Sequence, residues 1–127
     1  MDGVTCRKKI LIAEDEIVIA KLVRILLERK GYEVFTASDG AEALRLAFNE
    51  EPDLLILDLM MPKMTGEEVC RELRKDDQFD GMPVIMLTAK SGDADRVIGR
   101  VLGADEYMTK PFEGSELLGK IEELLTR

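Results

Sequence analysis

Several polar side chains of this chain stand directly after short, largely apolar runs. The runs and the residues that follow them are 10–13 with Glu14 and Asp15, 54–57 with Asp58, 84–87 with Thr88, and 107–109 with Lys110. If these runs are strands of an open parallel sheet, their carboxyl ends share one edge, and the polar side chains converge there. Carboxylates, a hydroxyl and an ammonium at one edge form a site for a divalent cation and a phosphoryl group.

The acidic part of this set predicts a metal site. Glu14, Asp15 and Asp58 would place their negative charges in one crevice, which is costly unless a cation occupies it. Oxygen ligands without nitrogen or sulfur suit Mg²⁺, Mn²⁺ or Ca²⁺, and an open site with few protein ligands favours Mg²⁺. Taken singly, the acidic pair is equally well explained as the charged start of a helix, and Asp58 as a turn residue. Beside a bound Mg²⁺, Asp58 could attack phosphorus and form an acyl phosphate.

Lys110 and Thr88 could both bind that phosphoryl group. The ammonium suits pairing with a carboxylate and then with a phosphoryl oxygen, and the Thr88 hydroxyl could bond a second oxygen. Read alone, Lys110 is a solvated turn residue and Thr88 a β-branched strand residue. A cis Lys110–Pro111 bond would turn the Lys head into the crevice, but only about 5–6% of X-Pro bonds are cis.

Composition limits the classes of protein that the chain can represent. Its 127 residues suit one domain, and 46% apolar residues are enough for a core. The absence of His removes Ser-His and Cys-His catalysis, and Cys6 and Cys70 form no metal or redox spacing. The net charge of −8 argues against direct nucleic-acid binding, which needs clustered Lys and Arg.

Two further features of the sequence bear on location. No apolar stretch is long enough to cross a membrane, and residues 1–8 form a short N-terminal segment without the apolar region of a secretory signal. We therefore expect a cytoplasmic location.

Helical and strand periods alternate along the rest of the chain. The predicted strands are 9–13, 33–37, 54–58, 83–88 and 106–109, and the predicted helices are 16–30, 40–49, 66–75, 94–102 and 114–125. This alternation predicts an α/β domain with a doubly wound parallel sheet covered by helices on both faces. The mixed second strand suits an edge, so the strand order 2-1-3-4-5 is expected, with its switch point between the first and third strands.

Local signals support several of these elements. Asp39 is a predicted helix cap, Thr65 and Glu68 form a predicted capping box, and Gly31 is a predicted helix stop. Residues 76–82 are expected to be a polar loop, and Cys70 a buried hydrophobe. The inner stripe of the first helix is expected to contain Ile19, Leu22, Val23, Leu26 and Leu27.

With these motifs in place, the chain resembles a receiver domain of two-component response regulators. The matching segments are 10–16, 58–66, 83–90, 103–107 and 110–112, and the resemblance as a whole covers the chain from about Lys9 to Leu125. The resemblance implies a flavodoxin-like fold over residues 9–127.

The resemblance also implies roles for the residues of the acidic crevice. Asp58 would accept the phosphoryl group and become a 4-aspartylphosphate. Glu14 and Asp15 would hold Mg²⁺, partly through water, with Asp58 and the backbone carbonyl of Met60 as further ligands. Mn²⁺ could replace Mg²⁺.

Four further residues receive roles from the same resemblance. Lys110 would pair with the phosphoryl group, positioned by a cis bond to Pro111. Thr88 would be the switch hydroxyl and Tyr107 the switch aromatic.

The implied function is signalling. A sensor histidine kinase or phosphotransfer protein would donate the phosphoryl group from a phosphohistidine, and the domain would catalyse only its own phosphorylation and slow autodephosphorylation. The output face would be the fourth helix, fifth strand and fifth helix, where a homodimer or an effector could bind. No membrane contact is expected.

Three other functions compete with this reading. An aspartyl-phosphate phosphatase of the haloacid dehalogenase type would carry a second Asp two residues after the nucleophile, where this chain has Met60. A flavin-binding module would need a Ser/Thr/Gly-rich loop in place of Glu14 and Asp15. A pseudo-receiver that only docks would lack part of the site.

Overall fold

A computed structural model of the chain describes residues 7–88 and 103–127. The strands are β1 (Lys9–Ala13), β2 (Glu33–Ala37), β3 (Leu54–Asp58), β4 (Val84–Thr88) and β5 (Glu106–Thr109), and the helices within the described residues are α1 (Ile17–Arg29), α2 (Gly40–Glu50), α3 (Gly66–Arg74), the short 3₁₀ helix η1 (Asp77–Phe79) and α5 (Gly114–Thr126). The helix predicted at 94–102 lies outside the described residues.

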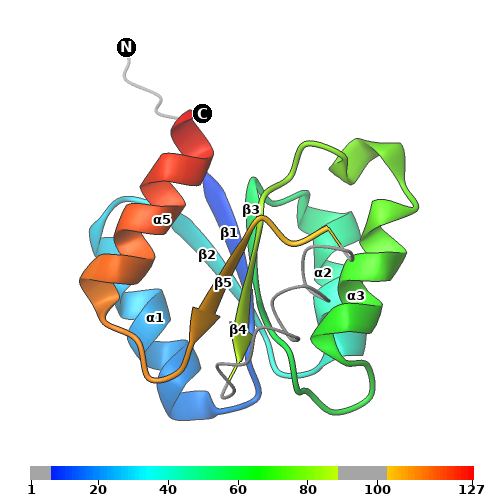
Figure 1. The fold of residues 1–127 in the computed structure, drawn as a ribbon, viewed down its shortest axis with the longest axis horizontal. Helices are drawn as coiled ribbons and strands as arrows, with labels where there is room; N and C mark the ends of the chain where they lie inside the picture. Colours follow the sequence, from blue (N-terminus) through cyan, green and yellow to red (C-terminus); the bar gives the residue numbers. More distant parts are fainter. Residues whose placement is uncertain (1–6, 89–102) are drawn as a thin grey trace.

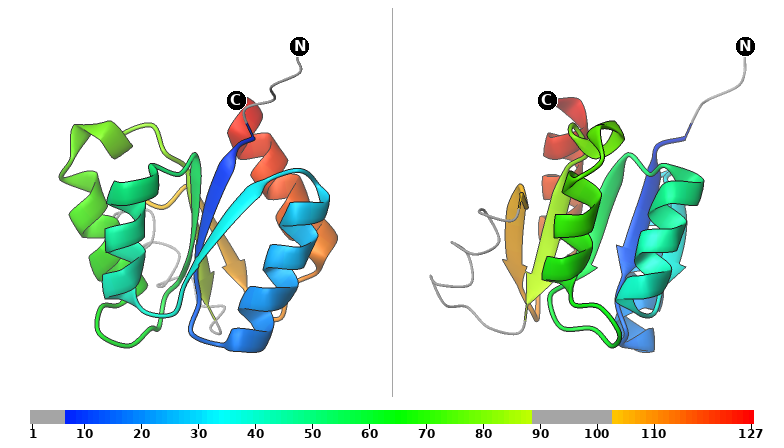
Figure 2. Two further views of the ribbon diagram at one scale, coloured as in Figure 1. Left: turned by 180° about the vertical axis from the view of Figure 1, so that it is seen from behind. Right: turned by 90° about the vertical axis from the view of Figure 1, so that its right-hand side faces the viewer.

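The five strands form one parallel sheet in the order β2-β1-β3-β4-β5, as predicted. Figure 1 shows α1 and α5 on one side of the sheet and α2 and α3 on the other, and the turned views in Figure 2 show the same layers. Helices on both faces bury β1, β3 and β4 from both sides, which explains their continuous apolar sequences. None of the helices in the described ranges has the length and apolarity required to cross a membrane.

Alternate residues of the central strands feed two cores. On one face, Leu55 and Leu57 of β3 pack with residues of α2 and α3 such as Ala43 and Val69. On the other face, Ile56 packs with residues of α1 and α5. This alternation fixes the register of β3, because a slip by one residue would exchange the two faces.

The predicted helix boundaries are confirmed by their caps. Asp39 accepts a hydrogen bond of 2.8 Å from the backbone N–H of Glu42. Thr65 and Glu68 form the reciprocal capping box at the start of α3. Gly31 follows α1 with φ of 93°, a conformation that glycine adopts without strain. Asp39 and Thr65 thus fix where α2 and α3 begin, and Gly31 fixes where α1 ends.

Two local expectations were wrong. The segment 76–82 is not simply a polar loop, because it contains η1, and Phe79 is buried there against Phe48 with the ring centroids 5.2 Å apart. Leu22, expected on the inner stripe of α1, is 58% exposed, whereas Val23 and Leu27 are buried. The apolar surface of α1 is therefore wider than the strip that the sheet covers.

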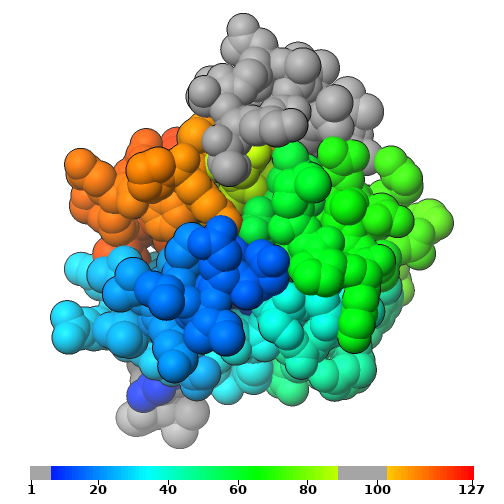
Figure 3. Space-filling model, turned by 90° about the horizontal axis from the view of Figure 1, so that it is seen from below, coloured from blue at the N-terminus to red at the C-terminus, as the bar shows by residue number. Residues whose placement is uncertain are grey.

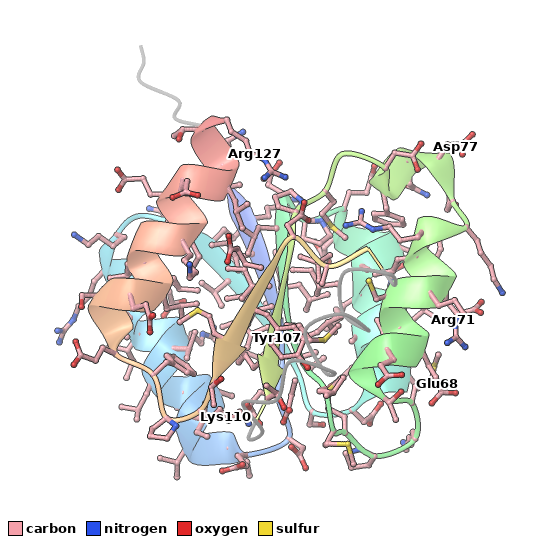
Figure 4. The ribbon with its side chains drawn as sticks, in the orientation of Figure 1. Glu68, Arg71, Asp77, Tyr107, Lys110 and Arg127 are labelled. Atoms are coloured by element: carbon pink, nitrogen blue, oxygen red, sulfur yellow. The ribbon has the colours of Figure 1, made fainter. Side chains whose placement is uncertain are left out.

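Charged groups tie the start of β5 to its surroundings, at the sheet edge opposite Lys110 (Figure 4). Asp105 accepts a hydrogen bond of 2.8 Å from the backbone N–H of Val84 and one of 2.7 Å from Arg127. Arg74 donates to the carbonyl oxygen of Gly103 at 2.7 Å. These bonds help to hold the strand that carries Tyr107 and leads to Lys110.

Gly66 lets α3 begin against the backbone of Asp58. Its N–H donates to the carbonyl oxygen of Leu59 at 3.0 Å, and a Cβ atom built on it would overlap the carbonyl oxygen of Asp58. We expect Gly66→Ala to destabilise the fold by about 2 kcal/mol, because backbone atoms must move to make room. Urea unfolding measures this loss. Gly119→Ala in α5 is the control, since a Cβ atom there meets nothing within 4 Å; an equal loss in both variants would contradict the steric account.

Candidate functional site

The side chains predicted to converge do lie at the carboxyl edge of the sheet. Glu14 and Asp15 follow β1, Asp58 ends β3, Thr88 ends β4, and Lys110 follows β5. Carboxylate oxygens of the first three lie within 4.8 Å of one another. On this face of the molecule, the blue segment after β1, the green segment after β3 and the orange segment after β5 meet (Figure 3).

Lys110 is the cation of this cluster, and Figure 4 shows it at the end of β5. Its Nζ lies 2.7 Å from Glu14 Oε1, 3.0 Å from Asp58 Oδ2 and 3.6 Å from Glu16 Oε1. The side chains of Glu14 and Asp58 are buried, and that of Lys110 is 12% exposed. The Lys110–Pro111 peptide bond is cis. The ammonium is thus held between two buried carboxylates.

Burial and close pairing shift the pKa values of both Glu14 and Lys110. Burial raises the pKa of Glu14 from 4.5 to about 7; the hydrogen bond to Lys110 opposes this rise, and the neighbouring Asp58 carboxylate adds to it. For Lys110, burial works to lower the pKa, but the hydrogen bonds to Glu14 and Asp58 outweigh it and leave the pKa above its usual value. Lys110 therefore stays charged, whereas Glu14 takes up a proton readily when no other cation is near.

This pKa rise predicts how stability depends on pH. The folded pKa of Glu14 is above its unfolded value, so its contribution to stability is fully present below about pH 4.5 and is lost as the pH rises through about 7. At about 1.4 kcal/mol per pH unit, the loss is on the order of 3 kcal/mol.

Urea unfolding in EDTA across this range should show the wild type losing stability relative to Glu14→Gln. Adding Mg²⁺ at neutral pH should reduce the difference, because a bound cation stabilises the carboxylate. A constant difference between the two proteins from pH 4 to pH 8 would contradict the burial of a titrating Glu14.

The acidic group fits a hard divalent cation. Glu14 Oε1 is buried and lies 2.7 Å from the Lys110 ammonium. Glu14 Oε2 accepts the backbone N–H of Glu16 at 3.1 Å, and Asp58 Oδ1 accepts that of Met60 at 3.2 Å. Asp15 is exposed and leaves an open side. An all-oxygen set with an open side suits Mg²⁺, which keeps several waters.

Thr88 and Tyr107 lie on different strands. Thr88 is buried at the end of β4, where it faces Thr109 of β5 across the ladder, and its carbonyl oxygen accepts the N–H of Lys110 at 2.6 Å. Tyr107 is partly buried and packs against the core on the side of α2 and α3. The two residues that the resemblance designates as switch residues are thus on adjacent strands.

Two features near the site were missed in the sequence. The first is the contact of Glu16 with Lys110, because the sequence predicts Glu16 only as the first residue of the helix 16–30. The second is a groove of about 630 Å³ between α1 and the segment after β5, whose lining includes Leu22, Ile25 and Phe112 together with Lys110. An apolar stripe on α1 wider than one buried face was the signal for the second.

Comparison with known proteins agrees with this fold and identifies the family. The family model of the response regulator receiver domain matches residues 10–122. The alkaline phosphatase synthesis transcriptional regulatory protein PhoP of Bacillus subtilis is 50% identical over 120 residues, which cover 94% of this chain and 49% of that protein. The chain therefore spans about half the length of this curated relative.

Solved structures give the same result. The chemotaxis protein CheY4 of Vibrio cholerae is 36% identical with a TM-score of 0.90, covering 94% of this chain and 100% of that one. A CheY-like response regulator receiver domain protein of Methanospirillum hungatei is 35% identical with a TM-score of 0.88, covering 94% of each chain. These matches do not favour the phosphatase alternative. The chain belongs to the response regulator receiver domain family of two-component signalling proteins.

Proposed function

We propose that Asp58 accepts a phosphoryl group in a Mg²⁺-dependent reaction and that the phosphorylated domain signals through a change of conformation. The observation that carries this proposal is the placement of Lys110 Nζ 3.0 Å from Asp58 Oδ2, inside an acidic crevice that opens to solvent at Asp15. A nucleophilic carboxylate with a fixed cation beside it is suited to phosphoryl transfer, where positioning and charge neutralisation do most of the work.

In this reaction an oxygen of Asp58 forms the new bond to phosphorus. The bond from phosphorus to the donor atom breaks, and the leaving group takes that electron pair. The Lys110 ammonium hydrogen-bonds the phosphoryl oxygens as their charge moves. Glu14, Asp15, Asp58 and the carbonyl oxygen of Met60 would hold Mg²⁺, which neutralises charge on the phosphoryl group when bound.

The product would place a dianionic group where Asp58 had one charge. Thr88 could then hydrogen-bond a phosphoryl oxygen, and movement of its side chain would open space for the ring of Tyr107. Such a step shifts an existing equilibrium between two conformations. We propose that β5, α5 and the predicted helix at 94–102, which lies outside the described residues, transmit the change to a second copy of the chain or to an effector.

The groove beside Lys110 supports a protein as the natural donor. Ile17, Val18 and Leu22 are exposed apolar side chains of α1, and Leu22 lines the groove together with Lys110. Apolar surface of this kind is typical of an interaction site. We propose that a histidine kinase or a phosphotransfer protein docks there with its phosphohistidine facing Asp58.

If the donor protein docks at this groove, a substitution in the groove should slow transfer from a protein donor and leave transfer from a small-molecule donor unchanged. The donor is a histidine kinase that phosphorylates the wild type. With this kinase, Leu22→Asp should be phosphorylated roughly tenfold or more slowly than the wild type, because a charge replaces an apolar contact. Its rate with acetyl phosphate should stay unchanged, since a small donor needs no docking surface. Radiolabel transfer measures the first rate and intact mass the second. Equal rates with the kinase for Leu22→Asp and wild type would remove the groove from the donor interface.

The phosphoacceptor proposal is tested by incubating the chain with acetyl phosphate and following its intact mass. With Mg²⁺ present, we expect the mass to rise by one phosphoryl group, and with EDTA in excess we expect almost no change. An unchanged mass with Mg²⁺ would contradict the proposal. An equal increase in EDTA would contradict the role of the acidic crevice.

A further inference from the structure

Glu16 stands at the start of α1, next to the site. It is the N-cap residue, with an extended backbone, but its side chain makes no capping hydrogen bond. Its N–H donates instead to Glu14 Oε2 at 3.1 Å, and its Oε1 lies 3.6 Å from Lys110 Nζ. The Glu16 side chain therefore adds to the charge around Lys110 and does not cap its helix.

The three carboxylates around Lys110 differ in their exposure. The side chains of Glu14 and Asp58 are 0% and 7% exposed, whereas that of Glu16 is 62% exposed. Glu16 thus stands on the solvent side of Lys110, and its contact is the longest of the three. A phosphoryl donor that approaches Lys110 from solvent meets the Glu16 carboxylate and must displace it or pass close to it.

The phosphoryl donor is itself an anion, so the negative charge of Glu16 opposes its approach to Lys110. We propose that Glu16 selects among phosphoryl donors by their charge, disfavouring small, free, highly charged donors by repelling them and by competing with them for Lys110. The inference rests on the proposed phosphoacceptor function of Asp58. Glu16 is on this account a specificity-determining residue, because it acts on the approach of the donor and on Lys110.

Coulomb's law sets the size of the effect. For charges roughly 7 Å apart in a water-like dielectric, removing the Glu16 charge should speed the reaction by about two- to threefold for each negative charge on the donor. Removing the Glu16 charge should therefore increase the rate with a dianionic donor about two- to threefold more than the rate with a monoanionic donor. The gain should shrink as ionic strength rises, because Glu16 is exposed and the interaction is screened.

The test compares two small donors on Glu16→Gln and on the wild type. Acetyl phosphate is a dianion near neutral pH and phosphoramidate is mainly a monoanion, and intact mass gives the initial rate with each. Saturating Mg²⁺ removes any difference in metal affinity, and the ratio of the two rates cancels effects on Asp58 that both donors share. Glu113→Gln is the matched control, because Glu113 is likewise an exposed N-cap residue whose side chain makes no capping bond.

We expect the ratio of the acetyl phosphate rate to the phosphoramidate rate to rise about two- to threefold in Glu16→Gln and to return toward the wild-type ratio at high salt. The ratio in Glu113→Gln should stay within the wild-type range. A ratio that is unchanged or lower in Glu16→Gln would overturn the inference while leaving Asp58 as the acceptor. Absence of phosphorylation of the wild type by either donor would instead overturn the proposed function.

Discussion

Asp58→Asn should abolish phosphorylation by acetyl phosphate in the presence of Mg²⁺. The amide oxygen of Asn carries no full negative charge, so it is a poor nucleophile toward phosphorus and a weaker ligand for a hard cation. The replacement has nearly the same shape, and it removes a negative charge from a buried crevice, so the fold should persist. Intact mass after incubation should show the wild type gaining one phosphoryl group and Asp58→Asn gaining none.

Asp39→Asn provides the control for this experiment. Asp39 also stands after a strand, and its side chain caps α2, a position at which Asn is as effective as Asp. This variant should be phosphorylated at the rate of the wild type. Phosphorylation of Asp58→Asn at the wild-type rate would show that another side chain is the acceptor.

Lys110→Met should lower the rate of phosphorylation by acetyl phosphate by about a hundredfold to a thousandfold, the usual effect of removing a donor aimed at developing charge. The ammonium lies 2.7 Å from Glu14 and 3.0 Å from Asp58, and Met keeps most of the side-chain volume without the charge. The variant leaves two buried carboxylates without their cation, so Glu14 should hold its proton more tightly and compete with Mg²⁺. Raising the Mg²⁺ concentration should recover part of the rate, but the direct role of Lys110 should stay lost.

Lys120→Met is the matched control for Lys110→Met. Lys120 also pairs with a carboxylate, that of Glu106 at 3.2 Å, and its side chain is 32% exposed. Urea unfolding should show both variants folded, and only Lys110→Met should lose the rate of phosphorylation. If the two variants react at similar rates, Lys110 does not act on the phosphoryl group.

The sequence contained enough information to predict the sheet and the positions of the acidic residues. Five apolar runs separated by helical periods allow few other topologies, and a residue that directly follows a parallel strand must lie at the carboxyl edge. The proximity of Glu14, Asp15 and Asp58 was therefore predictable from the sequence. Asp39 and Thr65 were predictable for a similar reason, because capping depends on residue type and local spacing.

Side-chain directions and exposed faces were not predictable in the same way. The contact between Glu16 and Lys110 depends on the rotamers of two long side chains separated by most of the chain. Leu22 was placed inside because periodicity marks apolar positions on a helix and does not say how wide a strip the sheet covers. Phe79 is buried, although it lies in the segment 76–82, whose charged residues have the composition of a loop.

The central claim, that Asp58 is the phosphoacceptor, is tested most directly by locating the phosphoryl group on the chain. After incubation with acetyl phosphate and Mg²⁺, sodium borohydride reduces the acyl phosphate carbonyl to an alcohol and releases phosphate, which converts a phosphorylated aspartate into homoserine. Peptide mass mapping of the reduced wild-type chain should find homoserine at position 58 and at no other aspartate. Reduction at Asp15 in place of Asp58, or at no position in a chain that has gained a phosphoryl group, would contradict the claim.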